Sequence, residues 1–198
     1  MQKLTQAILE HVARLPEGAT VSAKALLHLG SRAAVDQSLS RLVRRGQLIR
    51  AGRGLYVHPV ESRFGKRPPS VAHVVQALAA STDEVIASHG AAAANALGLT
   101  TQVPVREVYL TSGPSRRLKL GAKSVELRHA PKWQLTLAGR PSGEAIRALA
   151  WLGEAHAPAA LKTLSHRLST EALAEIVHAR PRLPTWLAQQ VSGLAVNG

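Results

Sequence analysis

The sequence SRAAVDQSLSRLVRRGQLIRAGRGLYVHP, residues 31–59, carries the clearest structural pattern in the chain. Ser31 is a suitable helix N-cap, and Gly46 is a suitable helix end. Between them, Val35, Leu39 and Leu42 form an apolar stripe at helical spacing. At about 100° per residue, the opposite face carries small, amide and basic side chains, which are Ala33, Gln37, Ser40, Arg41 and Arg44. A solvated face usually mixes Lys with Glu, so these residue types favour a helix that contacts another molecule.

Directly after this helix, two β-prone runs flank a glycine-rich turn. The runs are residues 48–50 and 55–57, and the turn between them places Arg53 at its tip. The flanking glycines permit the positive φ angles that a tight turn needs, and Pro59 ends the segment. The sequence therefore predicts a β-hairpin behind the helix. This arrangement is that of the wing in a winged helix, with Arg53 suited to a minor groove or a phosphate.

The residues before this segment predict two further helices. Apolar residues recur at helical spacing from residue 4 to residue 15, and Pro16 ends that pattern. Ser22 is expected to cap a second helix, which stops at Gly30. Because only a residue or two separate this helix from the next one, the pair has the spacing of a helix-turn-helix. Residues 1–60 are therefore predicted to form a winged helix-turn-helix domain.

This domain is predicted to bind double-stranded DNA. Glutamine side chains suit a base edge, and arginine side chains bind guanine or phosphate through two hydrogen bonds. The expected DNA-contacting residues lie on the helix and the hairpin, and they are Ser31, Arg32, Ala33, Gln37, Ser40, Arg41, Arg44, Arg45, Arg50, Arg53 and Tyr56. The alternative is a winged-helix protein-interaction module that binds an acidic protein partner without sequence-specific DNA recognition.

The charge distribution agrees with a polyanionic partner. The chain has 198 residues, with 25 Lys and Arg against 12 Asp and Glu, a formal net charge of +13. Residues 1–67 hold twelve of the bases and four of the acids, so this third of the chain carries +8. A stretch with charge, Gly65 and two prolines, ESRFGKRPPS at residues 61–70, is expected to be a linker. Residues 71–198 would then form a second domain.

Several classes of function are poorly supported by composition. The chain has no cysteine, and its two aspartates, Asp36 and Asp83, lie far apart, so a disulfide framework, a thiolate nucleophile and a multi-carboxylate metal site are all disfavoured. Nine histidines show no metal-binding spacing, and no phosphate-binding glycine loop occurs. We therefore expect a non-enzymatic protein without catalytic residues, cofactor or metal. No apolar run approaches about 20 residues, and the N-terminus lacks the pattern of a signal peptide, so a cytoplasmic location is expected.

The second domain is predicted to be α+β, with a small antiparallel sheet and a helical C-terminus. Ser70 is expected to cap a helix, and Ser88 a second helix of small residues that Gly98 ends. Strands are expected at residues 85–87, 107–111, 116–120 and 124–129. The helices expected after them start at Ser142, Pro158, Ser169 and about Pro184. Ser88 and His89 offer nucleophile and base types, but capping and packing explain them better because no nucleophile-elbow motif is present.

The sequence TSGPSRRLK, residues 111–119, predicts a basic hairpin in this domain. Backbone amides of Gly and Ser together with Arg116, Arg117 and Lys119 could hold a phosphate backbone or an acidic partner. An ordinary edge strand protected by charge explains the same residues equally well.

The motifs at residues 31–59 resemble those of the AbiEi-type antitoxin family. The helix start SRAAVDQ, the helix end LSRLVRRG and the hairpin GRGLY carry the resemblance, and SHGAAAANALGL and VYLTSGPSRRLKLGAKSVELRHAP extend it, so that about residues 1–135 are similar. The resemblance implies an N-terminal winged helix-turn-helix, with the DNA-reading helix on residues 31–45 and the wing on residues 50–56.

The same resemblance implies a function. Members are antitoxins of bacterial type IV toxin-antitoxin systems, associated with abortive infection against phage and paired with a nucleotidyltransferase-like toxin. They repress their own promoter by binding inverted repeats, and the C-terminal domain serves toxin neutralisation. A stable complex with the toxin is not required. We expect a monomer in solution that binds two operator repeats cooperatively, because one winged helix reads only a short site.

Overall fold

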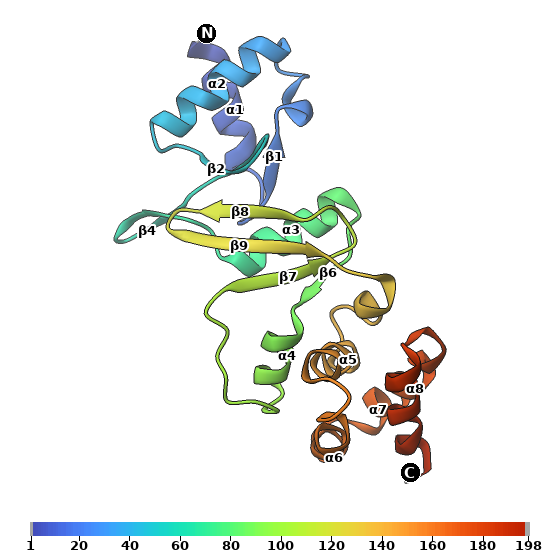
Figure 1. The fold of residues 1–198 in the computed structure, drawn as a ribbon. Coiled ribbons are helices and arrows are strands. Elements are labelled where there is room, and N and C mark those ends of the chain that lie inside the picture. The colour runs from blue at the N-terminus through green and yellow to red at the C-terminus, as the bar shows by residue number, and fades with distance from the viewer. Residues whose placement is uncertain (1, 197–198) are drawn as a thin grey trace. The chain divides into compact units, whose positions relative to one another are not determined.

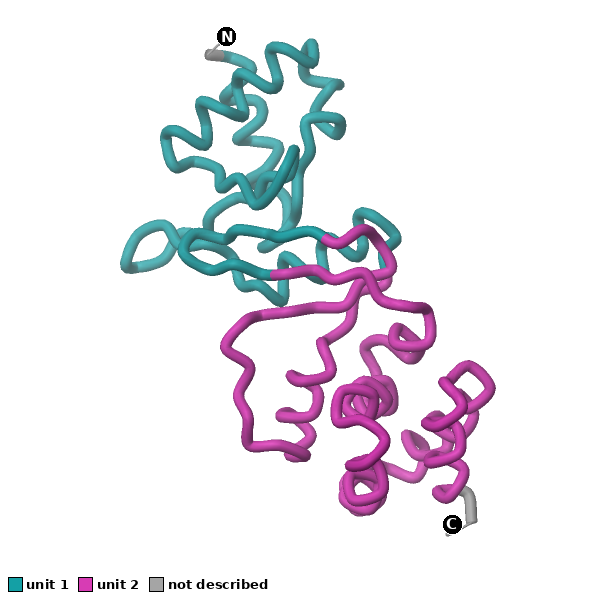
Figure 2. Tube along the Cα trace, in the orientation of Figure 1, with its two compact units in different colours: residues 1–84, 116–125 teal, residues 85–115, 126–198 magenta. Residues whose placement is uncertain are grey.

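The computed structural model describes residues 2–196 and divides into two compact units (Figure 2). Unit 1 comprises residues 1–84 and 116–125, and unit 2 comprises residues 85–115 and 126–198. The fold is α+β, with eight α-helices and small antiparallel sheets in the described part of the chain (Figure 1). Within residues 2–196, no helix combines the length and the apolar character required to cross a membrane.

The N-terminal part of unit 1 combines two helices with a three-stranded sheet. Its elements are α1 (Gln2–Ala13), β1 (Thr20–Ser22), the single 3-10 turn η1 (Lys24–Leu26), α2 (Arg32–Arg44), β2 (Ile49–Gly52) and β3 (Leu55–Val57). The strand order is β1-β3-β2, and both pairings are antiparallel. The hairpin expected after the α2 helix is therefore confirmed, as is the N-cap at Ser31, whose Oγ accepts a hydrogen bond from the Ala34 N–H at 3.4 Å.

The prediction of a second helix, capped by Ser22 and ended by Gly30, is wrong. The chain there forms only η1, followed by turns up to Gly30. Ser22 lies at the end of β1 and still accepts a hydrogen bond from the Ala25 N–H at 3.3 Å, so the residue starts a turn rather than a regular helix. Ala23 and Leu26 lie three residues apart and are both buried in the core, which matches the three-residue period of a 3-10 turn.

The core of this part of unit 1 is formed by the apolar faces of α1 and α2 over the sheet. Ile8 and Val12 of α1 pack in one cluster with Val35, Leu39 and Leu42 of α2, each no more than 1% exposed. Burial of one face of α2 fixes which residues of the helix remain outside, and hence which side chains are able to meet a partner.

Unit 1 continues with a second hairpin and a helix. The segment expected to be a linker contains β4 (Val60–Ser62) and β5 (Gly65–Arg67), which pair antiparallel. Helix α3 (Val71–Thr82) follows with Ser70 as its N-cap, as expected. Gly18 has φ +83°, and a Cβ there would lie 2.6 Å from backbone of His73 in α3, so the loop after α1 packs directly on this helix. Residues 71–84 thus belong to unit 1, whereas the sequence placed them in the second domain.

A four-stranded sheet follows in the chain. Its strands are β6 (Ile86–Ser88), β7 (Glu107–Thr111), β8 (Arg116–Leu120) and β9 (Lys123–His129), in the order β6-β7-β9-β8. All four strands were expected. Helix α4 (Gly90–Ala96) follows β6, but Ser88 is not its cap. The Nδ1 atom of His89 accepts the hydrogen bond from the Ala91 N–H at 3.2 Å instead, because Ser88 still belongs to the strand.

The C-terminal part of unit 2 is helical. The short turn η2 (Lys132–Leu135) leads into α5 (Pro141–Leu152), α6 (Ala157–Arg167) and α7 (Thr170–Ala179), and η3 (Arg180–Arg182) leads into α8 (Thr185–Ser192) and η4 (Gly193–Val196). Ile146 and Leu149 of α5, Leu164 of α6, Ile176 of α7 and Leu187 of α8 are completely buried in one shared cluster. The expected helical C-terminus is therefore confirmed in residues 141–196.

Candidate functional site

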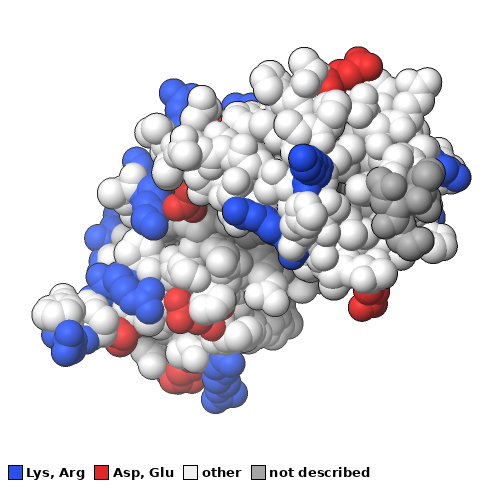
Figure 3. Space-filling model, turned by 90° about the horizontal axis from the view of Figure 1, so that it is seen from below, with Lys and Arg blue, Asp and Glu red and all other residues white. Residues whose placement is uncertain are grey.

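Most of the net positive charge belongs to unit 1. This unit holds sixteen Lys and Arg against six Asp and Glu, a net +10, whereas unit 2 carries +3. The face drawn in Figure 3 carries basic side chains at several places, many of them at its left side, with acidic side chains among them. Four of the sixteen bases come from residues 116–125, which sequence reasoning had assigned to the second domain. The fold thus adds basic residues to the N-terminal unit.

Helix α2 presents the expected residue types on its solvent side. Ala33, Gln37, Ser40 and Arg44 are all exposed, and they lie on the side opposite to the buried stripe. Alanine and serine leave room for a close approach, while glutamine and arginine donate hydrogen bonds to base edges or phosphates. The exposed face of α2 therefore combines two small side chains with two long side chains that can form hydrogen bonds.

The other arginines of α2 differ in their availability. The Nε atom of Arg32 donates to Oδ2 of Asp36 at 2.8 Å, so an acidic side chain on the same face neutralises this charge. Arg41 is half-buried, whereas Arg45 at the C-terminal end of the helix is exposed. The basic character of the face is consequently strongest at the C-terminal end of α2.

The β2–β3 hairpin adds two exposed arginines. Arg50 lies on β2, and Arg53 lies in the turn beside Gly54, whose φ of +68° is the left-handed conformation that glycine adopts readily. Tyr56 does not belong to this surface, which corrects the expectation. It is only 7% exposed and packs in the core with α1 and α2. On its other side Tyr56 pairs directly with Val21 of β1, which is 3% exposed, and directly opposite residues of an antiparallel pair share a face of the sheet.

Strand β8 lies beside the β2–β3 hairpin within unit 1. A Cβ on Gly52 would be 3.8 Å from the carbonyl oxygen of Arg117 and from Cδ2 of Leu118. Along β8, Arg117 and Lys119 are exposed, while Leu118 and Leu120 are each 1% exposed, as expected for alternating faces of a strand. The tertiary structure therefore brings the two exposed β8 cations close to the hairpin.

The remaining parts of the expected basic hairpin are engaged within the protein. Arg116 donates from Nη2 to Oε2 of Glu84 at 2.8 Å. In the turn before it, the Gly113 N–H donates to Oγ1 of Thr111 at 3.0 Å, and Oγ of Ser115 accepts from the His129 N–H at 2.8 Å. The Gly113 N–H and the Ser115 hydroxyl are thus used in hydrogen bonds within the protein.

Sequence reasoning missed the β4–β5 hairpin. Phe64 at its tip is 85% exposed, and the guanidinium carbon of Arg63 lies 4.7 Å from the centre of the Phe64 ring. Exposed aromatic rings next to arginine are a means of contacting bases or a partner surface. The signal was present as a phenylalanine between Arg63 and Gly65 in a polar segment, but two prolines nearby favoured a linker.

Metal chemistry has no candidate site in the part of the chain that the structure describes. No group of three or more His, Asp or Glu side chains within residues 2–196 is arranged to hold a metal ion.

The class defined by these features is an α+β protein with a strongly basic N-terminal unit. The chain belongs to a family of unknown function, DUF6088, whose pattern matches residues 7–176. No curated protein matches the chain in sequence. In structure, the chain is similar to the RV2827C protein from Mycobacterium tuberculosis, with a TM-score of 0.50 and 16% identity over 97% of this chain and 76% of that one. This likeness concerns the fold alone.

Proposed function

We propose that unit 1 contains a winged helix-turn-helix and that the protein is a sequence-specific DNA-binding autorepressor. The observation that carries the proposal is the solvent side of α2, where Ala33, Gln37, Ser40 and Arg44 are exposed together, followed by a hairpin with two exposed arginines. In this proposal α2 is the recognition helix, the β2–β3 hairpin is the wing, and η1 replaces the first helix of the motif by a single turn.

Each part of the surface has a distinct role in the proposal. The face of α2 enters the major groove, which is wide enough for a helix; Gln37 reads base edges there, and Arg44 contacts a phosphate at the groove edge. Arg53 at the tip of the wing contacts a phosphate or the minor groove, so it contributes affinity rather than sequence preference. Arg117 and Lys119 of β8 are proposed to add phosphate contacts beside the wing.

The proposal includes an antitoxin role, which rests on the resemblance to the AbiEi-type family. The functional partner would be a nucleotidyltransferase-like toxin of a type IV toxin-antitoxin system, counteracted without a requirement for a stable complex. The DNA target would be inverted repeats in the promoter of the chain's own gene. Because a single winged helix reads a short site, we propose that two copies bind the two repeats cooperatively.

The experiment that tests the DNA-binding proposal is a salt-titrated binding assay. The full chain is titrated against the duplex from upstream of its own gene and against a scrambled duplex of the same length and composition. A preference of about 10³ or more for the promoter is expected. Equal affinity for both, falling steeply with salt, would overturn sequence-specific recognition and favour the alternative of a module for an acidic protein partner.

Three further measurements separate the parts of the proposal. Footprinting is expected to protect both inverted repeats, and protection of a single half-site at saturation would contradict cooperative binding. Incubation of the bound duplex with Mg²⁺ is expected to leave the DNA intact, whereas cleavage would reassign the protein as a nuclease. Co-expression of the chain with a toxin from a neighbouring gene is expected to restore growth, and continued growth arrest would remove the antitoxin role.

A further inference from the structure

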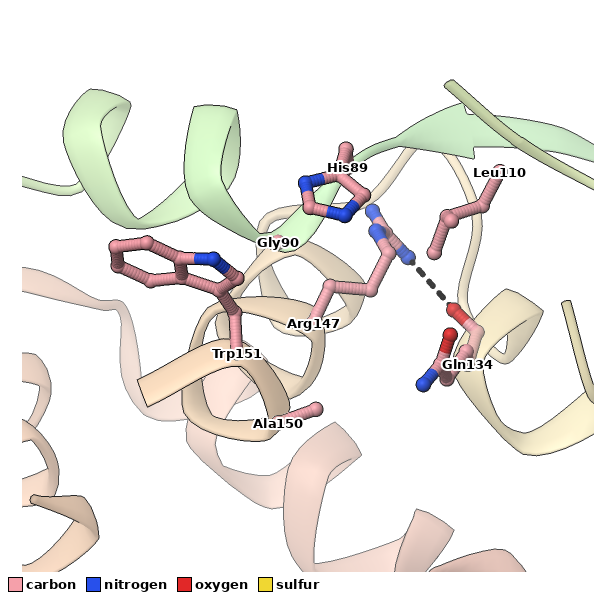
Figure 4. Close-up of a pocket in the computed structure, with 7 residues that line it drawn as sticks. All are labelled: His89, Gly90, Leu110, Gln134, Arg147, Ala150 and Trp151. Atoms are coloured by element: carbon pink, nitrogen blue, oxygen red, sulfur yellow. Dashed lines mark hydrogen bonds between the residues drawn. The ribbon is translucent and has the colours of Figure 1, made fainter. Parts of the chain in front are cut away.

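A cavity of about 280 Å³ lies in unit 2 between α4, α5 and η2 (Figure 4). Its lining includes His89 and Gly90 at the start of α4, Gln134 of η2, and Arg147 and Trp151 of α5. Trp151 is 38% exposed, so the cavity is reached from solvent on that side. The volume is near the lower end of the range for small-molecule sites, which fits a small metabolite rather than a macromolecule.

The most unusual group in this cavity is the guanidinium of Arg147. The residue is only 2% exposed, and its Nε atom is buried without a hydrogen-bond partner. Its Nη1 atom makes a long hydrogen bond of 3.5 Å to the carbonyl oxygen of Gln134. No carboxylate within residues 2–196 forms an ion pair with it, and Glu144, one turn earlier on α5, acts on its charge only from a distance.

The buried positive charge of Arg147 has no ion-pair partner within residues 2–196 that would stabilise it. Burial lowers the pKa of Arg147, but an arginine side chain stays protonated at neutral pH, so the positive charge remains. Buried charges in folded proteins are normally paired or hydrogen-bonded on all sides, because an isolated charge in a nonpolar surrounding is unfavourable. An anion in the adjacent cavity would supply the missing partner.

His89 places a second donor beside this charge. Its Nδ1 atom accepts from the Ala91 N–H, so the proton of the neutral imidazole is on Nε2. Burial, followed by the positive charge of Arg128, lowers the pKa of His89, which keeps the ring neutral at pH 7. Figure 4 shows the ring facing the guanidinium of Arg147. Two hydrogen-bond donors and no carboxylate therefore converge on the cavity.

The close approach of α4 and α5 fixes this geometry. A Cβ on Gly90 would lie 2.5 Å from Cβ of Trp151 and would also collide with the carbonyl oxygen of Arg147. Only glycine allows the backbone of α4 to pack on α5 at this point. His89, the residue immediately before it, is thereby held next to Arg147.

We propose that this cavity is a binding site for a small metabolite with a phosphate or carboxylate group, in which Arg147 is the charge partner and Nε2–H of His89 the second donor. The open side next to Trp151 leaves room for the rest of the ligand, and the indole ring offers a surface for a planar group. The site is formed by residues of unit 2 alone, so its existence does not depend on DNA binding by unit 1.

The test uses the full chain and two probes, inorganic phosphate and acetate, at constant ionic strength with chloride as the reference. The arginine Nε–H resonances are followed by nuclear magnetic resonance during each titration, which requires no substitution. We expect one buried Nε–H signal to shift saturably with a dissociation constant in the millimolar range or below. Saturation with phosphate alone identifies a phosphate site, and saturation with acetate alone or with both identifies a carboxylate-compatible site.

Variants assign the site to these residues. Arg147→Met keeps most of the side-chain volume and removes the charge together with its Nε–H signal, so binding by the variants is followed on the backbone amide resonances of the residues that line the cavity. This substitution is expected to weaken binding at least tenfold. His89→Phe is expected to weaken binding about threefold to tenfold. The matched control is Arg182→Met, which removes an exposed arginine of the same unit and is expected to leave binding unchanged. Absence of a saturable shift with either probe in the unmodified chain, or equal binding by Arg147→Met, would overturn the proposal.

Discussion

Two substitutions, Gln37→Ala in α2 and Arg53→Ala in the proposed wing, distinguish residues that contact bases from residues that contact phosphates. Arg44, Arg45, Arg50 and Arg53 are exposed and form no ion pair within residues 2–196, in contrast to Arg32. If each meets one phosphate, as do Arg117 and Lys119 of β8, the logarithm of the binding constant falls with the logarithm of salt concentration with a slope of about −5.4, from about −0.9 per phosphate. Doubling the salt concentration would then weaken binding about 40-fold.

Arg53→Ala and Gln37→Ala are expected to change the affinity for DNA and its salt dependence in different ways. Arg53→Ala removes one phosphate contact, so the slope becomes shallower, at about −4.5, and the affinity decreases by a similar factor on the promoter and on a scrambled duplex. Gln37→Ala removes a base contact worth about 1 to 3 kcal/mol, which corresponds to about a 5- to 160-fold loss on the promoter alone. The slope of this variant should stay unchanged.

Fluorescence anisotropy with both duplexes at four salt concentrations measures these quantities. Arg182→Ala, an exposed arginine in unit 2, serves as the matched control and should bind as the unmodified protein does. Equal losses of Gln37→Ala and Arg53→Ala on every duplex would refute the division of roles. A slope near zero for the unmodified protein would refute the assignment of these arginines to phosphates.

Three further predictions concern charge and packing. Asp36→Asn removes an acid from the α2 face and frees its arginine partner, so anisotropy should show up to about fivefold tighter binding to both duplexes, and weaker binding would contradict the placement of this face. The pKa of Glu17 is lowered, first by the Ser70 N–H that donates to it, so its ionised form stabilises the fold above the pKa of the unfolded chain and this contribution disappears as the pH falls through the folded-state value. As the pH falls below about 4, the free energy of unfolding measured with denaturant should therefore decrease more for the unmodified protein than for Glu17→Gln. Parallel curves of the free energy of unfolding against pH for the two proteins would argue against the interaction. Gly143→Ala would place a Cβ 2.6 Å from the carbonyl carbon of Leu137 and should lower the free energy of unfolding by about 1 to 3 kcal/mol, whereas Gly193→Ala, which meets open space, should change it by less than about 0.5 kcal/mol.

Local signals in the sequence were sufficient for most of the secondary structure. Ser31 and Ser70 were predicted as N-caps, and each accepts the hydrogen bond expected of a cap. The apolar stripe of α2 and the strands at residues 107–111 and 116–120 are also predicted correctly, because these patterns depend on the period of the helix or strand. The concentration of positive charge in the N-terminal third is likewise a property of the sequence.

Contacts between residues far apart in the sequence determined the features of the fold and of the candidate sites that the sequence did not predict. Burial of Ala23 and Leu26 in the core gave only η1 where a helix was expected, and pairing opposite the buried Val21 placed Tyr56 in the core. The position of β8 beside the β2–β3 hairpin joins cations separated by more than 60 residues, which no local pattern encodes. The same holds for Arg147, whose sequence context is an ordinary helix and whose burial depends on α4 packing over α5. Helical periods and capping groups act within a few residues and can be read from the sequence, whereas burial and electrostatic environment are set by segments that only the folded chain brings together.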